Sequence, residues 1–158
     1  MPENDVASAA LSEATVFIKP KRARPFFGRH PWVLESAILR VDGEPTSGAV
    51  VDVVTHDGNF IARGLWNASS RIRIRLYTFV ENEALDETFL RTRIENAFSL
   101  RQSFGLHSEK SGCRLINSEG DSLSGIIVDQ YGPYLALQVT ALAMAERLDM
   151  ICDSLENL

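Results

Sequence analysis

Apolar and polar positions alternate in short runs over the first half of the chain and recur at helical spacing over much of the second half. Residues 16–18, 37–41, 49–55, 60–66 and 71–77 are apolar or β-branched runs separated by Gly, Pro and Asp, so each predicts a strand. The Asp57-Gly58 pair predicts a tight hairpin between the third and fourth of these strands. Several short strands at such close spacing are typical of a small, curved, mainly antiparallel β-barrel.

The last of these strands alternates strictly between apolar and basic residues. Because successive side chains of a strand point to opposite faces, one face is predicted to be apolar and the other to expose Arg71, Arg73 and Arg75. This arginine row is one candidate surface for an anionic partner.

The second half predicts a small α/β unit. Asp86 suits a helix N-cap, and apolar residues then recur at helical spacing until Gly105 stops the run. Strands are expected at 114–116 and 125–129, with a hairpin from the second into 134–139, and a helix is expected over 141–158. That helix has no stop signal before Leu158, so we expect the chain to end inside something larger. Residues 1–14 lack an apolar period, so we predict a disordered tail followed by modules at 15–77 and 78–158, with the boundary near residues 80–86.

Charge separates the two modules more sharply than the overall balance suggests. The net charge of the chain is -5, but residues 15–75 carry +5 and residues 76–158 carry -7. A basic module next to an acidic one favours a nucleic-acid partner for the basic one. With 45% hydrophobic residues, no apolar run near the roughly 20 residues that cross a bilayer and no secretory signal, we expect a cytoplasmic globular protein without membrane contact.

A second group of cations lies in the loop after the first strand, interleaved with Pro20, Pro25, Phe26, Phe27 and Trp32. Such a cluster can bind phosphates while aromatic rings stack on a base, although a solvated basic loop over a core of Phe26 and Trp32 is the alternative. Together with the arginine row, this loop gives the module two separate basic elements, which favours an RNA-binding surface over a solvated loop. The RNA-binding candidates are Lys21, Arg22, Arg24, Arg29, His30, Arg71, Arg73 and Arg75. Arg91 and Arg93, on the predicted helix of the acidic module, are expected to stay clear of RNA.

The residues themselves predict no catalytic or metal site. The chain has no His or Cys pair at metal-ligand spacing and no glycine-rich nucleotide loop. Cys113 is the one thiol near a histidine, His107, and nothing brings the two together. Acids from Glu119 to Asp129 allow acid–base chemistry, but we favour a glycine turn whose acids bind backbone amides.

Four segments, taken in order, resemble one family. They are Arg29-His-Pro-Trp-Val33, Ala62-Arg-Gly-Leu-Trp-Asn67, Ile72-Arg-Ile-Arg75 and the segment from Ser118 to Gly132. The family is the bacterial PUA-bearing class I methyltransferases, which use S-adenosylmethionine (SAM) to methylate cytosine C5 in 23S ribosomal RNA. Ser124 stands where these proteins usually have proline, a mild change in a turn.

The resemblance implies a mainly β plus α/β fold: a PUA-like β pseudo-barrel that binds structured RNA, followed by a small α+β middle domain. In the family a Rossmann-like methyltransferase domain follows, and we expect it to be absent from this chain. Neither Cys113 nor Cys152 matches the family's catalytic cysteine, so no catalytic residue is expected here. With the methyltransferase domain absent and no metal-ligand spacing, no cofactor or metal is expected in this chain. SAM is expected for the full-length family.

We therefore expect the RNA-binding and accessory portion of a ribosomal RNA (cytosine-C5) methyltransferase, with 23S rRNA as the partner. The alternative is a stand-alone PUA-type RNA-binding protein without catalytic activity. The oligomeric state stays open, and a homodimer is among the allowed states.

Overall fold

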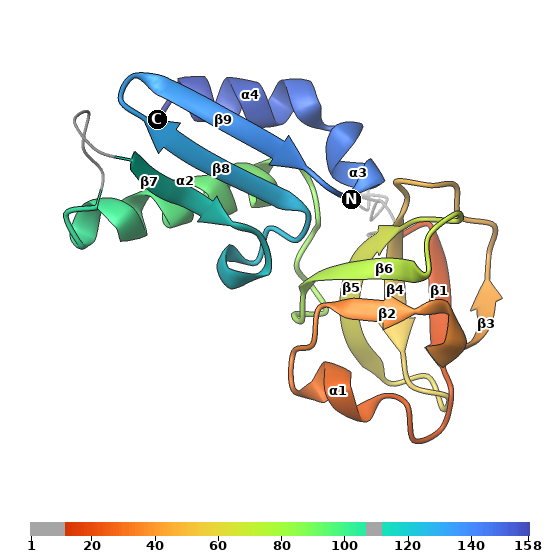
Figure 1. The fold of residues 1–158 in the computed structure, drawn as a ribbon. Coiled ribbons are helices and arrows are strands. Elements are labelled where there is room, and N and C mark those ends of the chain that lie inside the picture. Colours follow the sequence, from red (N-terminus) through yellow and green to blue (C-terminus); the bar gives the residue numbers. More distant parts are fainter. Residues whose placement is uncertain (1–11, 107–111) are drawn as a thin grey trace, which may run out of the picture.

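The computed structural model describes residues 12–106 and 112–158, which form two sheets (Figure 1). The first sheet has the strand order β2-β6-β5-β4-β1-β3 and is curled into a half-barrel. Its strands are β1 (Ala14–Ile18), β2 (Trp32–Leu34), β3 (Ile38–Asp42), β4 (Val50–Val54), β5 (Phe60–Trp66) and β6 (Ile72–Thr78). Only β1 and β4 run parallel; the other neighbours are antiparallel. Two short helical segments join β1 to β3, α1 (Arg24–Phe27) before β2 and the 3-10 turn η1 (Glu35–Ala37) after it.

The half-barrel, called the barrel below, curls around side chains that alternate inward along its strands. Val16, Val51 and Ile74 are fully buried, and Phe26 from α1 covers one end of the same cluster. Gly64 allows β5 and β6 to approach, because a Cβ at this position would lie 2.3 Å from the Arg75 carbonyl oxygen. The hairpin predicted at Asp57-Gly58 is confirmed, since β4 pairs antiparallel with β5.

One charged group lies inside this first unit. The Arg63 side chain is only 2% exposed, and its Nε donates to Asp52 Oδ1 at 2.7 Å. The same guanidinium donates to the Glu83 carbonyl oxygen, and the Ser12 hydroxyl donates to Asp52 at 2.9 Å. The Asp52–Arg63 pair therefore joins β4 and β5 to the residue Ser12 before β1 through Asp52, and to the segment after β6 through Arg63.

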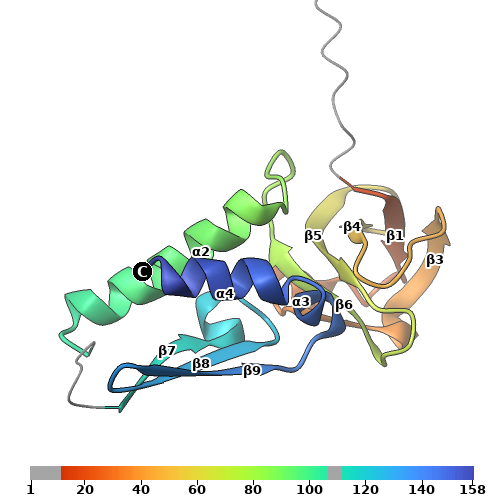
Figure 2. The ribbon, with the colours of Figure 1, turned by 90° about the horizontal axis from the view of Figure 1, so that it is seen from above.

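The second unit packs helices on one side of a three-stranded sheet (Figure 2). Its strands are β7 (Gly112–Asn117), β8 (Ile126–Tyr131) and β9 (Tyr134–Val139), with the 3-10 turn η2 (Ser118–Asp121) after β7. Its helices are α2 (Glu87–Ser103), α3 (Leu142–Ala145) and α4 (Leu148–Glu156). As predicted, Asp86 is the N-cap of α2 and accepts from the Phe89 amide at 2.8 Å.

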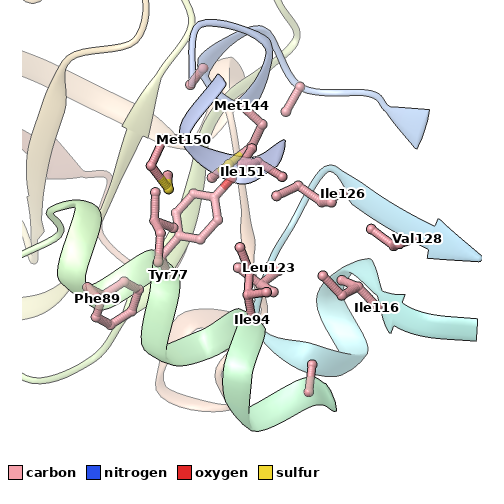
Figure 3. Close-up of a cluster of buried hydrophobic side chains, with 14 of the residues drawn as sticks. Tyr77, Phe89, Ile94, Ile116, Leu123, Ile126, Val128, Met144, Met150 and Ile151 are labelled. Atoms are coloured by element: carbon pink, nitrogen blue, oxygen red, sulfur yellow. The ribbon is translucent and has the colours of Figure 1, made fainter. Parts of the chain in front are cut away.

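The core of the second unit extends into the barrel (Figure 3). Ile94, Leu123, Ile126 and Ile151 are fully buried at its centre. Leu65 from β5 and Tyr77 from β6 belong to the same apolar cluster. The two sheets are therefore joined by a shared core.

Three predictions about the backbone need correction. The helix expected over 141–158 is split, because the chain turns at Glu146 and Arg147, where the Arg147 guanidinium donates to the carbonyl oxygens of Ala143 and Gly48. β2 was missed because three residues after Pro31 carry too little periodicity. The tail predicted over 1–14 overlaps β1 at Ala14, while residues 1–11 lie outside the described residues.

The module boundary predicted near residues 80–86 stays a prediction, because it concerns whether the two modules fold independently of each other. β6 ends at Thr78 and α2 begins at Glu87. Within the described residues, no helix is long and apolar enough to span a bilayer.

The buried ion pair should be far more sensitive to substitution than an exposed one. Asp52→Asn leaves the buried Arg63 charge without its counter-ion and should lower the free energy of unfolding by roughly 3–5 kcal/mol. The matched control is Asp129→Asn, which breaks a pair with the half-exposed Arg114 and should cost less than about 1 kcal/mol. Urea unfolding measures both, and equal losses would show that burial of Arg63 does not set the cost.

Candidate nucleic-acid interface

The basic loop after β1 is held by an apolar anchor. Phe26 in α1 is 3% exposed and fixes the helix on the barrel, whereas the next residue, Phe27, is 65% exposed. Lys21 and Arg29 adopt left-handed backbone conformations with φ of 65° and 60°, which are uncommon for residues other than glycine. The buried Phe26 ring therefore fixes the position of the loop on the barrel, while the basic side chains around it stay on the surface.

The predicted RNA-binding residues of this loop are all exposed. They are Lys21, Arg22, Arg24, Arg29 and His30. Within residues 12–106 and 112–158, none of the four Lys and Arg side chains in this set forms an ion pair with an acid. Their positive charge is therefore available to an anionic partner.

A groove of about 250 Å³ runs between α1 and β2 beside these cations. It is lined by Arg22, Pro25, Phe26, His30, Trp32 and Leu34, together with two small residues of η1. The rings of His30 and Trp32 meet edge to face, with centroids 6.0 Å apart. His30 Nδ1 accepts from the Trp32 amide at 3.2 Å, so the neutral ring carries its proton on Nε2 and keeps a donor for a ligand.

The arginine row of β6 differs from its prediction. Arg71 is exposed, but the side chains of Arg73 and Arg75 are only 13% and 18% exposed. Arg73 pairs with Glu35 at 2.8 Å and lies over the Trp66 ring. Strand alternation correctly puts Ile74 and Leu76 in the core, but alternation does not reveal what covers the opposite face. The predicted exposed row is wrong for Arg73 and Arg75.

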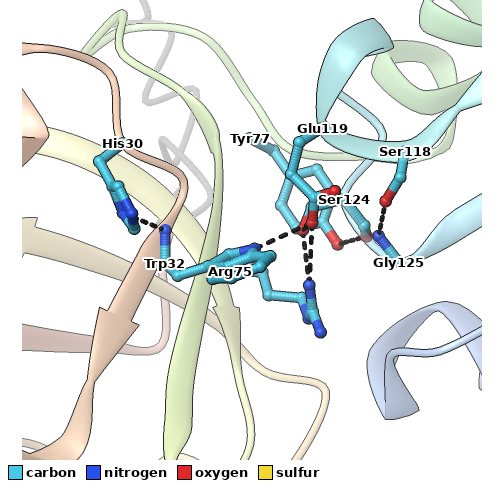
Figure 4. Close-up of polar contacts among 8 residues, drawn as sticks. All are labelled: His30, Trp32, Arg75, Tyr77, Ser118, Glu119, Ser124 and Gly125. Atoms are coloured by element: carbon cyan, nitrogen blue, oxygen red, sulfur yellow. Dashed lines mark hydrogen bonds and ion pairs between the residues drawn. The ribbon is translucent and has the colours of Figure 1, made fainter.

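Arg75 belongs instead to a polar network at the junction between the two units (Figure 4). The Glu119 carboxylate accepts from Trp32 Nε1 at 2.9 Å, from Arg75 at 3.1 Å and from the Ser124 hydroxyl at 2.7 Å. The Tyr77 hydroxyl donates to the Ser124 carbonyl oxygen at 2.6 Å. The segments 29–33 and 118–132, which carry the family resemblance, therefore meet in space.

This network changes the acidity of its members. Burial raises the pKa of Glu119, but hydrogen bonds from Ser124, Ser118, its own backbone amide and Trp32 together outweigh burial and lower the pKa to about 2. Burial also raises the pKa of Tyr77 well above its ordinary range. Glu119 is therefore a charged acceptor and Tyr77 a neutral donor at neutral pH.

The acids of the turn after β7 act as structural acceptors, only partly in the predicted way. Asp121 accepts from the Asn117 amide at 2.6 Å, as expected, but also from both terminal nitrogens of Arg101 at 2.6 and 2.7 Å. Glu119 accepts from its own backbone amide, in the predicted way, but also from the side chains of Trp32 and Arg75 in the barrel.

Two expectations about catalysis and metals stay predictions. Over the described residues, no three His, Cys, Asp or Glu side chains are grouped so as to hold a metal ion. His107 lies outside the described residues, so its relation to Cys113 is not tested.

Comparisons with known proteins agree with this geometry. The sequence model of the PUA-like domain family matches residues 16–79. The chain is 38% identical over 122 residues to ribosomal RNA large subunit methyltransferase I of Shewanella amazonensis, covering 77% of this chain and 31% of that protein. It is 33% identical over 145 residues to the protein of the same name from Aeromonas hydrophila, covering 92% and 36%. The chain spans about a third of the length of these curated relatives.

The fold also matches a solved structure. A Streptococcus mutans protein assigned as a SAM-dependent methyltransferase superposes with a TM-score of 0.73 at 16% identity, over 90% of this chain and 37% of that one. At this identity the likeness shows the fold alone.

The half-barrel of residues 16–79 is thus a PUA-like domain. The chain fits the N-terminal region of the PUA-bearing ribosomal RNA methyltransferases, which confirms the resemblance in the sequence.

Glu119 should make stability depend on acid pH. Its pKa is about 2 in the folded chain against 4.5 as the ordinary value. Because the folded pKa is the lower one, the ionised carboxylate stabilises the fold fully above about pH 4.5, and this contribution is lost as pH falls toward 2. Urea unfolding of the wild type and of Glu119→Gln across this range should show the difference between them shrinking with acid. A difference that does not change with pH would contradict this role.

Proposed function

We propose that this chain is the RNA-binding and accessory portion of a ribosomal RNA methyltransferase. The observation that carries the proposal is the α1–β2 surface, where unpaired cations border an aromatic groove on a PUA-like domain. Grouped cations attract phosphates, and an aromatic groove accepts an unstacked base. Each property alone is common on protein surfaces, but their coincidence favours RNA.

The groove suits a base held at the edge of a structured RNA. Trp32 is 37% exposed, and its indole N–H already donates to Glu119, so a base would meet the ring and not this donor. Arg22 lines the groove and Arg24 lies on the adjoining helix, where both can reach phosphates on either side of that base. His30 Nε2 offers a hydrogen bond to the base or its sugar.

We further propose 23S rRNA as the partner, cytosine C5 as the target atom of the whole enzyme and the cytoplasm as its location. Relatives at 33–38% identity are named ribosomal RNA large subunit methyltransferase I, which supports the large-subunit RNA. The cytosine assignment rests on the motif resemblance in the sequence.

The described residues do not fit a SAM site of the Rossmann type. In such a site a glycine-rich turn joins a strand to a helix and lets the backbone approach the cofactor. The strand-to-helix connections of the described chain lead from β1 to α1, from β6 to α2 and from β9 to α3, and none of them contains glycine. We therefore propose that the two modules bind and position RNA without holding the methyl donor.

Calorimetric titration of the chain with SAM should give no binding heat, because no described strand-to-helix turn can cradle it. Stoichiometric binding in the micromolar range would contradict the accessory role.

RNA affinity should depend on the cations of the α1–β2 surface. If Lys21, Arg22, Arg24 and Arg29 each contact a phosphate, log K against log salt should fall with a slope near -3, at roughly -0.7 to -0.9 per contact. Replacing Arg22 and Arg24 together with alanine should weaken binding of an RNA stem-loop and flatten the slope by roughly 1.4 to 1.8. Fluorescence anisotropy with labelled RNA measures both quantities.

The matched control is Arg114→Ala, which removes a half-exposed arginine on β7 of the second unit. It should leave affinity and slope unchanged. Equal losses from both variants, or an affinity that does not respond to salt, would place the RNA on another surface.

A further inference from the structure

A second cleft, of about 350 Å³, lies at the junction between the barrel and the second unit. Its lining includes Arg29 from the α1–β2 loop, Arg93 from α2, Phe79 after β6 and Ser122 after η2. The sequence predicts that Arg93, on the acidic module, stays clear of RNA. The structure instead brings Arg93 to the same cleft as a cation of the basic loop.

Both guanidinium groups rest on aromatic rings. Arg29 lies 5.8 Å from the centroid of the Phe79 ring, and Arg93 lies 4.8 Å from that of Phe89. Neither side chain forms an ion pair or donates a hydrogen bond within the part of the chain that the structure describes. Stacking on a ring orients a guanidinium while leaving its N–H donors for a ligand.

The two carboxylates that line the cleft already accept hydrogen bonds from neighbouring side chains. Glu119 accepts from Trp32, Arg75 and Ser124, as described above, and Arg75 compensates its charge. The Glu83 carboxylate accepts from the Thr78 hydroxyl. Arg29 and Arg93 therefore lack a described acid partner, although they share the cleft with two carboxylates.

Two of the four non-glycine residues with left-handed backbone among the described residues line this cleft. Arg29 has φ of 60° and Ser122 has φ of 58°, so two non-glycine residues of one cleft adopt the left-handed conformation. Arg29 occupies the position after a helix end where glycine is usually found. Such conformations cost free energy and gather at ligand sites, which favours a binding role for this side chain.

From these observations we propose that Arg29 and Arg93 bind one phosphodiester group of the RNA backbone across the junction cleft. The RNA path then continues from the α1–β2 groove over the junction and onto α2. A pair of guanidinium groups presents several N–H donors to the nonbridging oxygens of a phosphate. This inference rests on the proposed RNA-binding function and adds the second module to the RNA surface.

Arg93→Gln tests the inference, with Arg91→Gln as its matched control. The two residues lie two positions apart on α2, so their side chains point about 200° apart around the helix. With an RNA stem-loop, Arg93→Gln should weaken binding about fivefold and reduce the salt slope by roughly 0.7 to 0.9. Arg91→Gln should leave both unchanged, and Arg93→Lys, which keeps the charge, should retain most of the slope.

A double-mutant cycle with Arg29→Gln tests whether the two arginines share one phosphate. If they do, the combined loss in affinity should differ from the sum of the two separate losses. Urea unfolding of each variant checks that the loss does not follow from weaker folding, since Arg93 stacks on Phe89.

The outcomes separate this inference from the proposed function. If Arg22→Ala with Arg24→Ala weakens binding while Arg93→Gln behaves as Arg91→Gln, the junction site is wrong and RNA binding by the barrel stands. If the wild-type chain does not bind the stem-loop, the proposed function itself is wrong.

Discussion

The Glu119 carboxylate is the acceptor through which the polar part of the junction holds the two units in a defined orientation. Trp32 and Arg75 donate to it from β2 and β6, and these residues are directly paired in the barrel sheet. Tyr77, two residues further along β6, donates to Ser124 from within the shared apolar core. The polar and apolar contacts of the junction therefore both involve strand β6, which pairs with β2 at one edge of the barrel sheet. With a pKa of about 2, Glu119 keeps its charge at neutral pH.

Contacts at this junction also fix several side chains of the candidate RNA surface. Trp32 lines the α1–β2 groove and also donates to Glu119 of the second unit. The hydrogen bond to Glu119 therefore orients the indole ring that forms one wall of the groove. Arg75, which the sequence pattern assigns to RNA, donates to Glu119. Arg93, which the sequence analysis expects to stay clear of RNA, lines the junction cleft with Arg29. The net charge of a module therefore does not predict which of its arginines are paired within the fold and which line a cleft.

Local patterns predicted most of the elements because their causes are local. The period-two runs located the longer barrel strands, and the Asp86 cap located the start of α2. The split between α3 and α4 was missed because residues 141–158 contain no Gly or Pro to mark it, and the contact of Arg147 with Gly48 at this turn spans 99 positions. The partners of Trp32 and Arg75 were missed because Glu119 lies 87 and 44 positions away. The motif resemblance marked both segments of the junction, but only the fold shows that they touch.

A single RNA surface that crosses the junction can be detected by hydrogen–deuterium exchange of the chain with and without an RNA stem-loop. On RNA binding, amide exchange should slow in two separate stretches, residues 22–32 around α1 and β2 and residues 87–94 in the first turns of α2. Slower exchange in the first stretch alone would confine the RNA to the barrel and contradict the continuous surface. Slower exchange confined to β7–β9 would place the RNA on neither the α1–β2 surface nor the junction cleft.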